Sequence, residues 1–296
     1  MYDAIIVGGS FAGISAGLQL ARARRNVLVI DGGKRRNRFA ATSHGFLGHD
    51  GRAPGDIVGD GREELLAYPT AEWIDGEAAS AKRTEEGFAV TLGDGIEAFG
   101  KRLVLAIGVK DTLPDVPGLG ELWGKSVFHC PYCHGYELDR QPVGVLGVNE
   151  SSMHHALMLP DWSPTTFFVN GAFALTGEHR EKLKARNVTV EETPIREVAG
   201  PGAKVHLADG RSFAMAGLFT ATWNAPASAL PQQLGCEFDD NGLATTIRTD
   251  GMKQTTVPGV FAAGDAARAF GNVAIAVADG VMAGASAHRS LMFGME

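Results

Sequence analysis

Apolar runs divide the chain into two similar strand–turn–helix units. Residues 4–7 form a short apolar run that leads into a glycine-rich turn at 8–13, and a helix rich in small residues follows at 14–22. A second unit of this kind starts at 143–146 and turns at 147–152. Short apolar runs bounded by glycine are typical of strands buried in parallel sheets. The pattern predicts an α/β fold with two doubly wound, Rossmann-like domains.

Later segments complete each unit. Further strands are expected at 27–31, 103–108, 166–169, 217–222 and 259–265, and residues 272–292 are expected to form a Gly/Ala-rich helix. The Pro/Gly-rich stretch 114–120 is typical of a crossover between domains. We therefore expect a dinucleotide-binding domain made of residues 1–113 and 246–296. A second domain, 114–245, is inserted within it.

Composition excludes several classes of partner. The chain has 296 residues and a formal net charge of -7, so no basic footprint argues for nucleic acid. No apolar run is long enough to span a bilayer. The first residues enter a strand without the pattern of a signal peptide, which predicts a cytoplasmic protein. The basic residues 34–38 are interpreted as a solvated loop rather than as a phosphate or partner site.

The first turn carries the fingerprint of a dinucleotide site. A strand, the turn GGSFAG and a helix are followed by a second strand that ends in Asp31. That order places an acid where it can bind a ribose hydroxyl. Ser10 replaces the glycine that lets the backbone approach a pyrophosphate. Because serine is small, we expect the site to be retained.

Two of the three cysteines form the pair Cys130 and Cys133 within FHCPYCHGYE. In a reducing compartment this spacing indicates a redox-active dithiol or a metal site. Cys236 stands alone, and no second ligand pair completes a tetrahedral zinc site, so zinc is only a minor alternative and no metal is expected. Cys236 is expected to be a partly buried free thiol.

These features together resemble the low-molecular-weight thioredoxin reductases over the whole chain. The matching segments are GGSFAG with Asp31, the strand end at 106–108, the Cys-Pro-Tyr-Cys segment and GVFAAGD at 259–265. The resemblance implies FAD as cofactor, with Asp265 at its ribityl and phosphate region, and a homodimer. The cofactor-binding residues it implies are Gly8, Gly9, Ser10, Phe11, Ala12, Gly13, Asp31, Gly108, Gly264, Asp265, Asn272 and Val273.

The second turn departs from that family. Asn149 stands where the nicotinamide site has its close-approach glycine, and Glu150 adds negative charge at a helix start. Residues 170–175 lack the arginines that would bind a 2′-phosphate. We therefore interpret the second nucleotide site as degenerate, with an altered but working site as the alternative.

The segment after the dithiol departs as well. His134 follows the second cysteine, where thioredoxin reductases have aspartate. This pattern resembles the dithiol oxidases that close disulfides in gliotoxin- and holomycin-type natural products. In those enzymes electrons pass from the substrate dithiol to the enzyme disulfide, to FAD and to O2. The resemblance predicts oxidation of a small-molecule dithiol.

The catalytic roles implied by the resemblance fall on three residues. Cys130 exchanges with substrate sulfur, Cys133 faces the flavin, and His134 moves protons. His129 either shares that role or simply packs, and His44 lies either in a flavin-lining loop or on the surface. Alternative functions are an NADPH-dependent reductase of a thioredoxin-like protein, a ferredoxin-linked reductase and a flavin-bound redox sensor.

Overall fold

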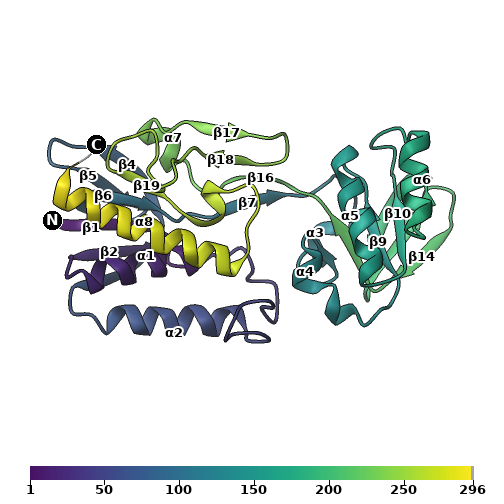
Figure 1. The fold of residues 1–296 in the computed structure, drawn as a ribbon, viewed down its shortest axis with the longest axis horizontal. Coiled ribbons are helices and arrows are strands. Elements are labelled where there is room, and N and C mark those ends of the chain that lie inside the picture. The colour runs from purple at the N-terminus through teal and green to yellow at the C-terminus, as the bar shows by residue number, and fades with distance from the viewer. Residues whose placement is uncertain (295–296) are drawn as a thin grey trace.

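A computed structural model describes residues 1–294 as two lobes joined by a pair of strands (Figure 1). The chain starts in the first lobe, crosses to the second, and returns to the first for its last helix, α8 (Val273–Phe293). Both lobes contain parallel β-sheet covered by helices. The predicted α/β fold with an inserted second unit is confirmed.

The sheet of the first lobe has seven strands. Its order is β3-β2-β1-β6-β5-β4, with β19 also pairing with β6. The strands around β1 are parallel, whereas β4, β5 and β6 form an antiparallel extension. Their bounds are β1 (Tyr2–Val7), β2 (Val27–Asp31), β3 (Ala71–Asp75), β4 (Ala78–Arg83), β5 (Phe88–Leu92), β6 (Glu97–Leu105) and β19 (Val260–Ala262).

This sheet is buried on both faces, which explains its continuous apolar runs. In β1, Ile5 and Val7 belong to one hydrophobic cluster, while Ala4 and Ile6 belong to the other. Alternate side chains of a strand point to opposite faces, so a strand covered on both sides must be apolar at every position.

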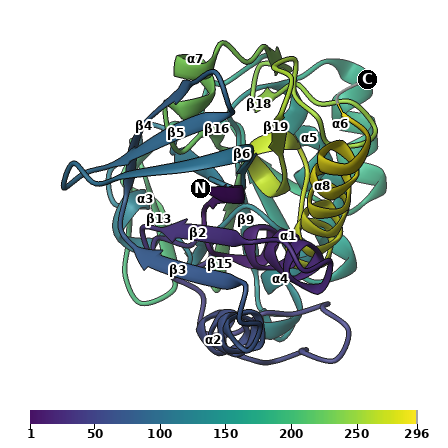
Figure 2. The same ribbon diagram turned by 90° about the vertical axis from the view of Figure 1, so that its left-hand side faces the viewer.

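Helices α1 (Phe11–Arg22) and α8 lie side by side on one face of this sheet (Figure 2). Their backbones approach closely, because a Cβ atom at Gly280 or Gly284 would overlap the backbone of α1 at Ala12 or Ala16. Helix α2 (Pro54–Leu66) packs on the outer side of α1. The packing of α8 on α1 brings the start of both helices to the same edge of the sheet.

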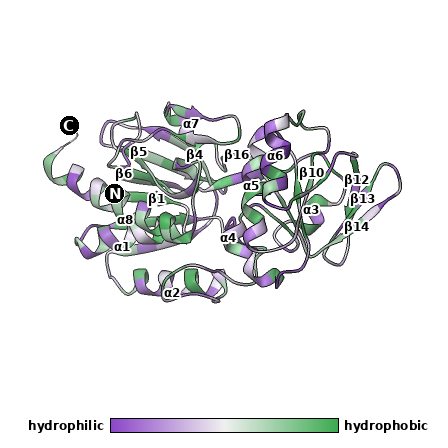
Figure 3. Ribbon diagram, turned by 45° about the vertical axis from the view of Figure 1, so that its right-hand side comes forward, coloured by the Kyte–Doolittle hydropathy of each residue, from purple (hydrophilic) through white to green (hydrophobic). Residues whose placement is uncertain are grey.

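The second lobe contains a five-stranded parallel sheet in the order β11-β10-β9-β15-β8. An antiparallel sheet, β12-β13-β14, covers part of it. Hydrophobic residues line the inner strands, and α6 is largely hydrophilic (Figure 3). The strands are β8 (Val127–Phe128), β9 (Val143–Leu146), β10 (Thr165–Phe168), β11 (Thr189–Glu191), β12 (Ile195–Ala199), β13 (Ala203–Leu207), β14 (Ser212–Met215) and β15 (Gly217–Thr220).

The helices of this lobe are short. The α-helices are α3 (Leu119–Leu122), α4 (Pro131–His134), α5 (Met153–Met158) and α6 (Gly177–Ala185). The 3-10 turns are η1 (Tyr136–Leu138), η2 (Glu150–Ser152) and η3 (Leu159–Asp161). The second strand–turn–helix unit therefore opens into a broken helix rather than the continuous helix of the first unit.

The two crossings pair with each other, but the return comes earlier than residue 246. Strand β7 (Val109–Thr112) leads out and β16 (Trp223–Pro226) leads back, as an antiparallel pair. Leu230 and Cys236 already pack in a core cluster of the first lobe. Residues 230–245, which the sequence places in the second domain, thus join the first through α7 (Leu230–Leu234), β17 (Phe238–Asp240) and the start of β18 (Thr245–Ile247).

Candidate active site

The glycine-rich turn between β1 and α1 is packed too closely at Gly8 and Gly13 to hold a side chain at either position. Gly8 has a φ of +102°, and a Cβ atom there would overlap the carbonyl of Ala106. A Cβ atom at Gly13 would overlap the carbonyl oxygen of Gly8. The backbone N–H of Gly9 donates to Oδ1 of Asp31 at 3.0 Å. The turn therefore presents backbone, and the carboxylate at the end of β2 is fixed beside it.

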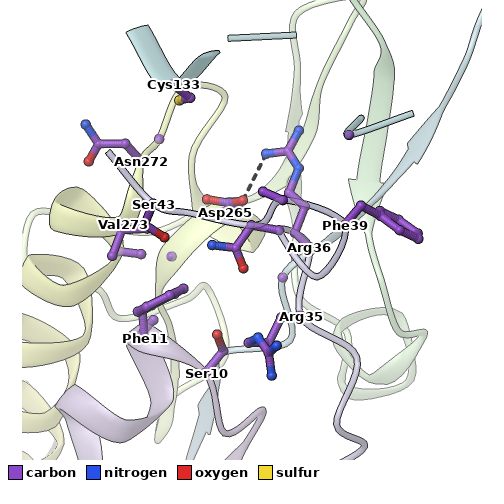
Figure 4. A pocket seen from close by; sticks show the side chains of 18 of the residues that line it. Ser10, Phe11, Arg35, Arg36, Phe39, Ser43, Cys133, Asp265, Asn272 and Val273 are labelled. Atoms are coloured by element: carbon purple, nitrogen blue, oxygen red, sulfur yellow. Dashed lines mark hydrogen bonds and ion pairs between the residues drawn. The ribbon is translucent and has the colours of Figure 1, made fainter. Parts of the chain in front are cut away.

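A cavity starts at this turn and reaches the dithiol of the second lobe. Figure 4 shows Ser10 near one end of it and Cys133 near the other, with Asp265 between them. Most of the predicted site residues line this cavity, namely Gly8, Gly9, Ser10, Phe11, Ala12, Asp31, Gly108, Cys133, His134, Gly264, Asp265, Asn272 and Val273. Cys130 and Gly13 lie outside the lining; Gly13 instead allows close packing against Gly8.

The cavity wall fits a large, anionic dinucleotide such as FAD. Arg35 Nε and Ser43 Oγ are buried atoms without a hydrogen-bond partner, and both residues line the cavity. Ser10, at the start of α1, makes no side-chain capping bond, and no acidic residue occupies the first turn of that helix. Helix N-termini and unpaired cationic donors attract phosphate groups. The residues present would accommodate a diphosphate at this end.

Arg36 joins three segments at the middle of the cavity. Its Nη1 lies 2.9 Å from Oδ2 of Asp265 (Figure 4), and its Nη2 and Nε lie 2.6 and 2.9 Å from the carboxylate of Asp111 in β7. Thr222, next to β16, donates to the same carboxylate at 2.8 Å. The prediction that residues 34–38 form a solvated loop is wrong for Arg35 and Arg36, because both line the cavity.

This network determines the charge of its members. Burial would raise the pKa of Asp111, but hydrogen bonds from Arg36 and Thr222 more than offset it, and the pKa lies below its usual range. Burial opposes the charge of Arg36, yet the two carboxylates raise the pKa of its guanidinium. Arg36 and Asp111 are therefore both charged at neutral pH, and Arg36 is held by its carboxylate partners rather than left to a ligand.

Cys130 and Cys133 form a disulfide in the structure. Cys130 precedes α4, whose first residue is Pro131, and the N–H of Cys133 donates to the carbonyl of Cys130 at 3.2 Å. Cys133 faces the cavity and Cys130 does not. Tyr132 is 71% exposed and packs edge-on against Trp162, 5.2 Å between ring centres. The turn thus gives the two sulfur atoms different surroundings.

His134 lies where a base for the dithiol is needed. Its ring stacks on Phe128 with centres 4.2 Å apart, and it lines the cavity with Cys133. Burial lowers the pKa of His134, Glu137 opposes that shift, and His44 adds to it. A lowered pKa keeps the imidazole neutral at physiological pH, and a neutral imidazole can accept a thiol proton.

His129, on the other side of Cys130, has a different character. Burial, reinforced by Arg36, lowers the pKa of His129 to about 3. Its ring lies 5.9 Å from that of Trp123, and both residues line the cavity. An imidazole with so low a pKa is a weak base near neutral pH.

In the second turn, residues 147–152, backbone N–H groups donate hydrogen bonds to side chains of the same turn. Asn149 Oδ1 accepts from the N–H of Ser151 at 2.9 Å and from its hydroxyl at 2.6 Å. The N–H of Val148 donates to the hydroxyl of Ser152 at 2.9 Å. Glu150 pairs with His179 at 3.2 Å. The backbone N–H groups of Val148 and Ser151, which a phosphate could use, are therefore already bonded within the turn.

Residues 170–175 also take part in packing and hydrogen bonding within the second lobe. Asn170 Oδ1 accepts from the N–H of Ile195 at 2.8 Å. Phe173 and Leu175 pack against a core cluster of the second lobe. The segment thus supplies packing and one internal hydrogen bond at the place where a nucleotide-binding site needs cations.

Sequence reasoning missed several polar residues of the cavity. Arg35, Arg36, Ser43 and Asp111 line it, although none belongs to the fingerprint. The only local signal was the basic run directly after the strand that ends in Asp31. His44, whose position the sequence left open, also lines the cavity. Asn272, one of the predicted cofactor-binding residues, caps α8 by accepting from the N–H of Ile275 at 2.9 Å. Cys236 is a buried free thiol, as expected.

Among residues 1–294, no helix is both long and apolar enough to cross a membrane. In the same range, no group of three or more His, Cys, Asp or Glu side chains is arranged to hold a metal ion.

Comparison with known proteins gives matches over nearly the whole chain. The family described as pyridine nucleotide-disulphide oxidoreductase matches residues 2–280. Thioredoxin reductase tcpT of Claviceps purpurea is 33% identical over 307 residues, which cover 98% of this chain and 94% of that protein. These matches confirm the resemblance inferred from the sequence.

Solved structures match equally well. An oxidoreductase from Agrobacterium tumefaciens is 53% identical with a TM-score of 0.96, covering 99% of each chain. The structure of HlmI is 37% identical with a TM-score of 0.91, covering 98% of this chain and 92% of that one. The arrangement of both lobes is therefore shared with known structures.

Proposed function

We propose that this chain, which belongs to the pyridine nucleotide-disulphide oxidoreductase family, oxidises a small-molecule dithiol to a disulfide with O2 as the final acceptor. The family consists of FAD-binding enzymes, and FAD supplies the two-electron redox chemistry between thiols and the acceptor. The observation that carries the proposal is the contrast between the two turns. The first opens onto a cavity that reaches the disulfide, and the second is closed by its own side chains.

The two cysteines are proposed to have separate roles. Cys130 lies outside the cavity that would hold FAD, so we assign it to exchange with the substrate. Cys133 lines that cavity, so we assign it to electron transfer toward FAD. In the exchange, a substrate thiolate attacks Cys130 of the enzyme disulfide, which forms a mixed disulfide and releases the Cys133 thiolate. The second substrate thiolate then attacks the substrate sulfur of the mixed disulfide and releases the Cys130 thiolate. The substrate leaves oxidised, and the enzyme holds the dithiol.

His134 is proposed to handle the protons of this exchange. Its low pKa and its place beside Cys133 fit a base that accepts a thiol proton and returns it later. Regeneration of the disulfide releases two electrons and two protons. FAD bound in the cavity would supply the redox chemistry that carries the two electrons to O2, and O2 with two protons would leave as H2O2. The net reaction is dithiol plus O2 giving disulfide plus H2O2.

A second candidate is an NADPH-dependent reductase of a thioredoxin-like protein. The curated relatives favour it, because tcpT carries the name thioredoxin reductase. Against it stand the occupied backbone donors of the second turn and the absence of cationic residues from 170–175. A homodimer and a cytoplasmic location stay predictions from the sequence.

Anaerobic reduction of the FAD-loaded protein separates the two candidates. Flavin absorbance is followed during separate titrations with NADPH, NADH and dithiothreitol. We expect rapid bleaching by dithiothreitol alone, with the yellow colour and H2O2 appearing when air is admitted. Rapid stoichiometric bleaching by NADPH would instead assign the chain to the nucleotide-dependent reductases.

The cysteine assignment is tested by Cys133→Ser. This variant should bind FAD normally but lose flavin reduction by dithiols, because the sulfur that faces the cavity is gone. Cys236→Ser is the matched control, because Cys236 is buried in the first lobe away from the dithiol. This variant should leave the rate of flavin reduction unchanged. Flavin reduction that survives in Cys133→Ser would refute the assignment.

A further inference from the structure

A loop of the first lobe touches the dithiol segment of the second beside the cavity. His44 Nε2 lies 3.3 Å from Oε1 of Glu137 in η1, three residues after His134. His44 and His134 both line the cavity. The contact joins two segments that are far apart in the sequence, and the chemistry assigned above to Cys130, Cys133 and His134 gives it no role.

The surroundings of His44 lead from the cavity to solvent. The His44 side chain is 21% exposed, whereas Asp50 is 72% and Glu137 is 40% exposed. Asp50 Oδ1 lies 3.6 Å from His44 Nδ1 and is fixed by the N–H of Gly45, which donates to it at 2.8 Å. The Thr42 hydroxyl lies 3.0 Å from His44 Nε2. On the cavity side, His44 is near enough to His134 to contribute to the lowering of the His134 pKa.

The proposed chemistry needs a route of this kind. Each oxidised dithiol releases two protons at the sulfur atoms, while O2 consumes two protons elsewhere. His134 can hold only one proton, and its lowered pKa makes it release that proton readily. A partly buried base must therefore pass its proton to a neighbour that contacts water before it can act again.

We propose that His44 and Glu137 form a proton relay that connects His134 to Asp50 and the solvent. His134 accepts the thiol proton, the His44–Glu137 pair receives it, and Asp50 or water takes it from the exposed side. In the reverse direction the same groups return a proton to a leaving thiolate. The relay rests on the proposed thiol chemistry at Cys130 and Cys133, and not on the choice of O2 as acceptor.

His44→Gln and Glu137→Gln test the relay, with His49→Gln as the matched control. His49 lies in the same loop, its ring is tilted against that of Phe46 with centres 5.0 Å apart, and it lies outside the cavity lining. The rate of anaerobic flavin bleaching by saturating dithiothreitol is measured by stopped flow across the pH range 6 to 9. Because direct acid–base groups contribute about 10²–10⁴-fold, we expect about a tenfold loss for a group one step removed.

Three further readouts distinguish a relay from a structural role. FAD content and the rate of re-oxidation in air should be unchanged in both relay variants. The solvent deuterium isotope effect on the limiting rate should increase, and added imidazole should restore part of the rate in His44→Gln. His49→Gln should match the unmodified protein. Unchanged limiting rates in both His44→Gln and Glu137→Gln at every pH would overturn the relay.

The design also separates failure of the relay from failure of the proposed function. Rapid bleaching of the unmodified protein by NADPH would reject the oxidase, while the dithiothreitol rates would still decide the relay. Where dithiothreitol opens the disulfide without bleaching flavin, samples are quenched with iodoacetamide. Alkylation of Cys130 and Cys133 then gives the rate of disulfide opening, on which the same tenfold difference is expected.

Discussion

The turns at residues 8–13 and 147–152 start from similar strands but use their backbone donors differently. In the first, Ser10 makes no capping bond, and α1 continues for 12 residues with no acid in its first turn. In the second, Asn149 caps a short 3-10 turn, and Glu150 lies within it. The same topology thus yields an uncapped turn without acidic residues in one lobe and a turn bonded to its own side chains in the other.

The ends of the following strands differ in the same way. Asp31, at the end of β2, lines the cavity and accepts from Gly9 at 3.0 Å. Asn170, just after β10, has a φ of +53° and accepts from Ile195 at 2.8 Å. A carboxylate facing a cavity can bind ribose hydroxyls, whereas an amide used inside the fold cannot. Binding capacity therefore depends on which polar groups the fold leaves unbonded, rather than on topology.

The largest expected effect comes from adding one methyl group to each turn. Gly13→Ala would place a Cβ atom on the Gly8 carbonyl, and because backbone cannot yield, we expect about 3 kcal/mol of destabilisation. FAD should be lost, because the first turn must move. Gly147→Ala places its Cβ atom 2.6 Å from the Val169 carbonyl oxygen. It should weaken the second lobe while FAD stays bound.

The measurements are the ratio of flavin to protein after gel filtration and the free energy of unfolding. Gly177→Ala is the control, because its Cβ atom would meet open space in the first turn of α6. Loss of FAD in Gly147→Ala as well would show that the two turns are not independent.

An intermediate effect is expected from acid, which should act first on the second lobe. Burial lowers the pKa of His129 to about 3 and that of His155 to about 4, both from an ordinary value of 6.5. Between pH 6.5 and 4 the unfolded chain therefore binds more protons than the folded one, so stability decreases as pH falls. Each histidine should contribute about 1 kcal/mol per pH unit in this window.

Thermal unfolding from pH 7.5 to 4.5, monitored separately by flavin release and by far-UV circular dichroism, checks this prediction. His155→Gln should reduce the pH dependence of the second-lobe transition, because Gln does not titrate in this range. An identical pH slope in His155→Gln would contradict the assigned cause.

The sequence predicted most of the strands that are buried on both faces, with β5 as an exception, and missed most of those that are not. Residues 4–7 of β1 and all of β9 are continuous runs without polar side chains, so the positions of these strands could be predicted. In β13, buried Val205 alternates with Lys204 and His206, and this alternating antiparallel sheet was not predicted. Leu230 and Cys236 are isolated apolar residues, and nothing local indicates which of two cores they join.

The site residues differ in the same way, because only those with a local signal in the sequence could be predicted. Residues of the turns were predictable because glycine spacing and strand ends are local features. The Arg36 network was not, because Arg36, Asp111 and Asp265 come from three separated segments that meet only in the folded chain. The basic run at 34–38 looks like an ordinary solvated loop until β7 and the turn after β19 are placed beside it.

The smallest effect, and the sharpest comparison, comes from Asn149→Gly. This change releases the N–H of Ser151 and restores the glycine of the fingerprint. Glycine is tolerated as an N-cap, so the free energy of unfolding should change by only a few tenths of a kcal/mol. NADPH should still fail to bleach the flavin, because Glu150 remains and residues 170–175 still lack cations. Bleaching by NADPH in this variant would show that the Asn149 side chain alone keeps the second turn from using the nucleotide.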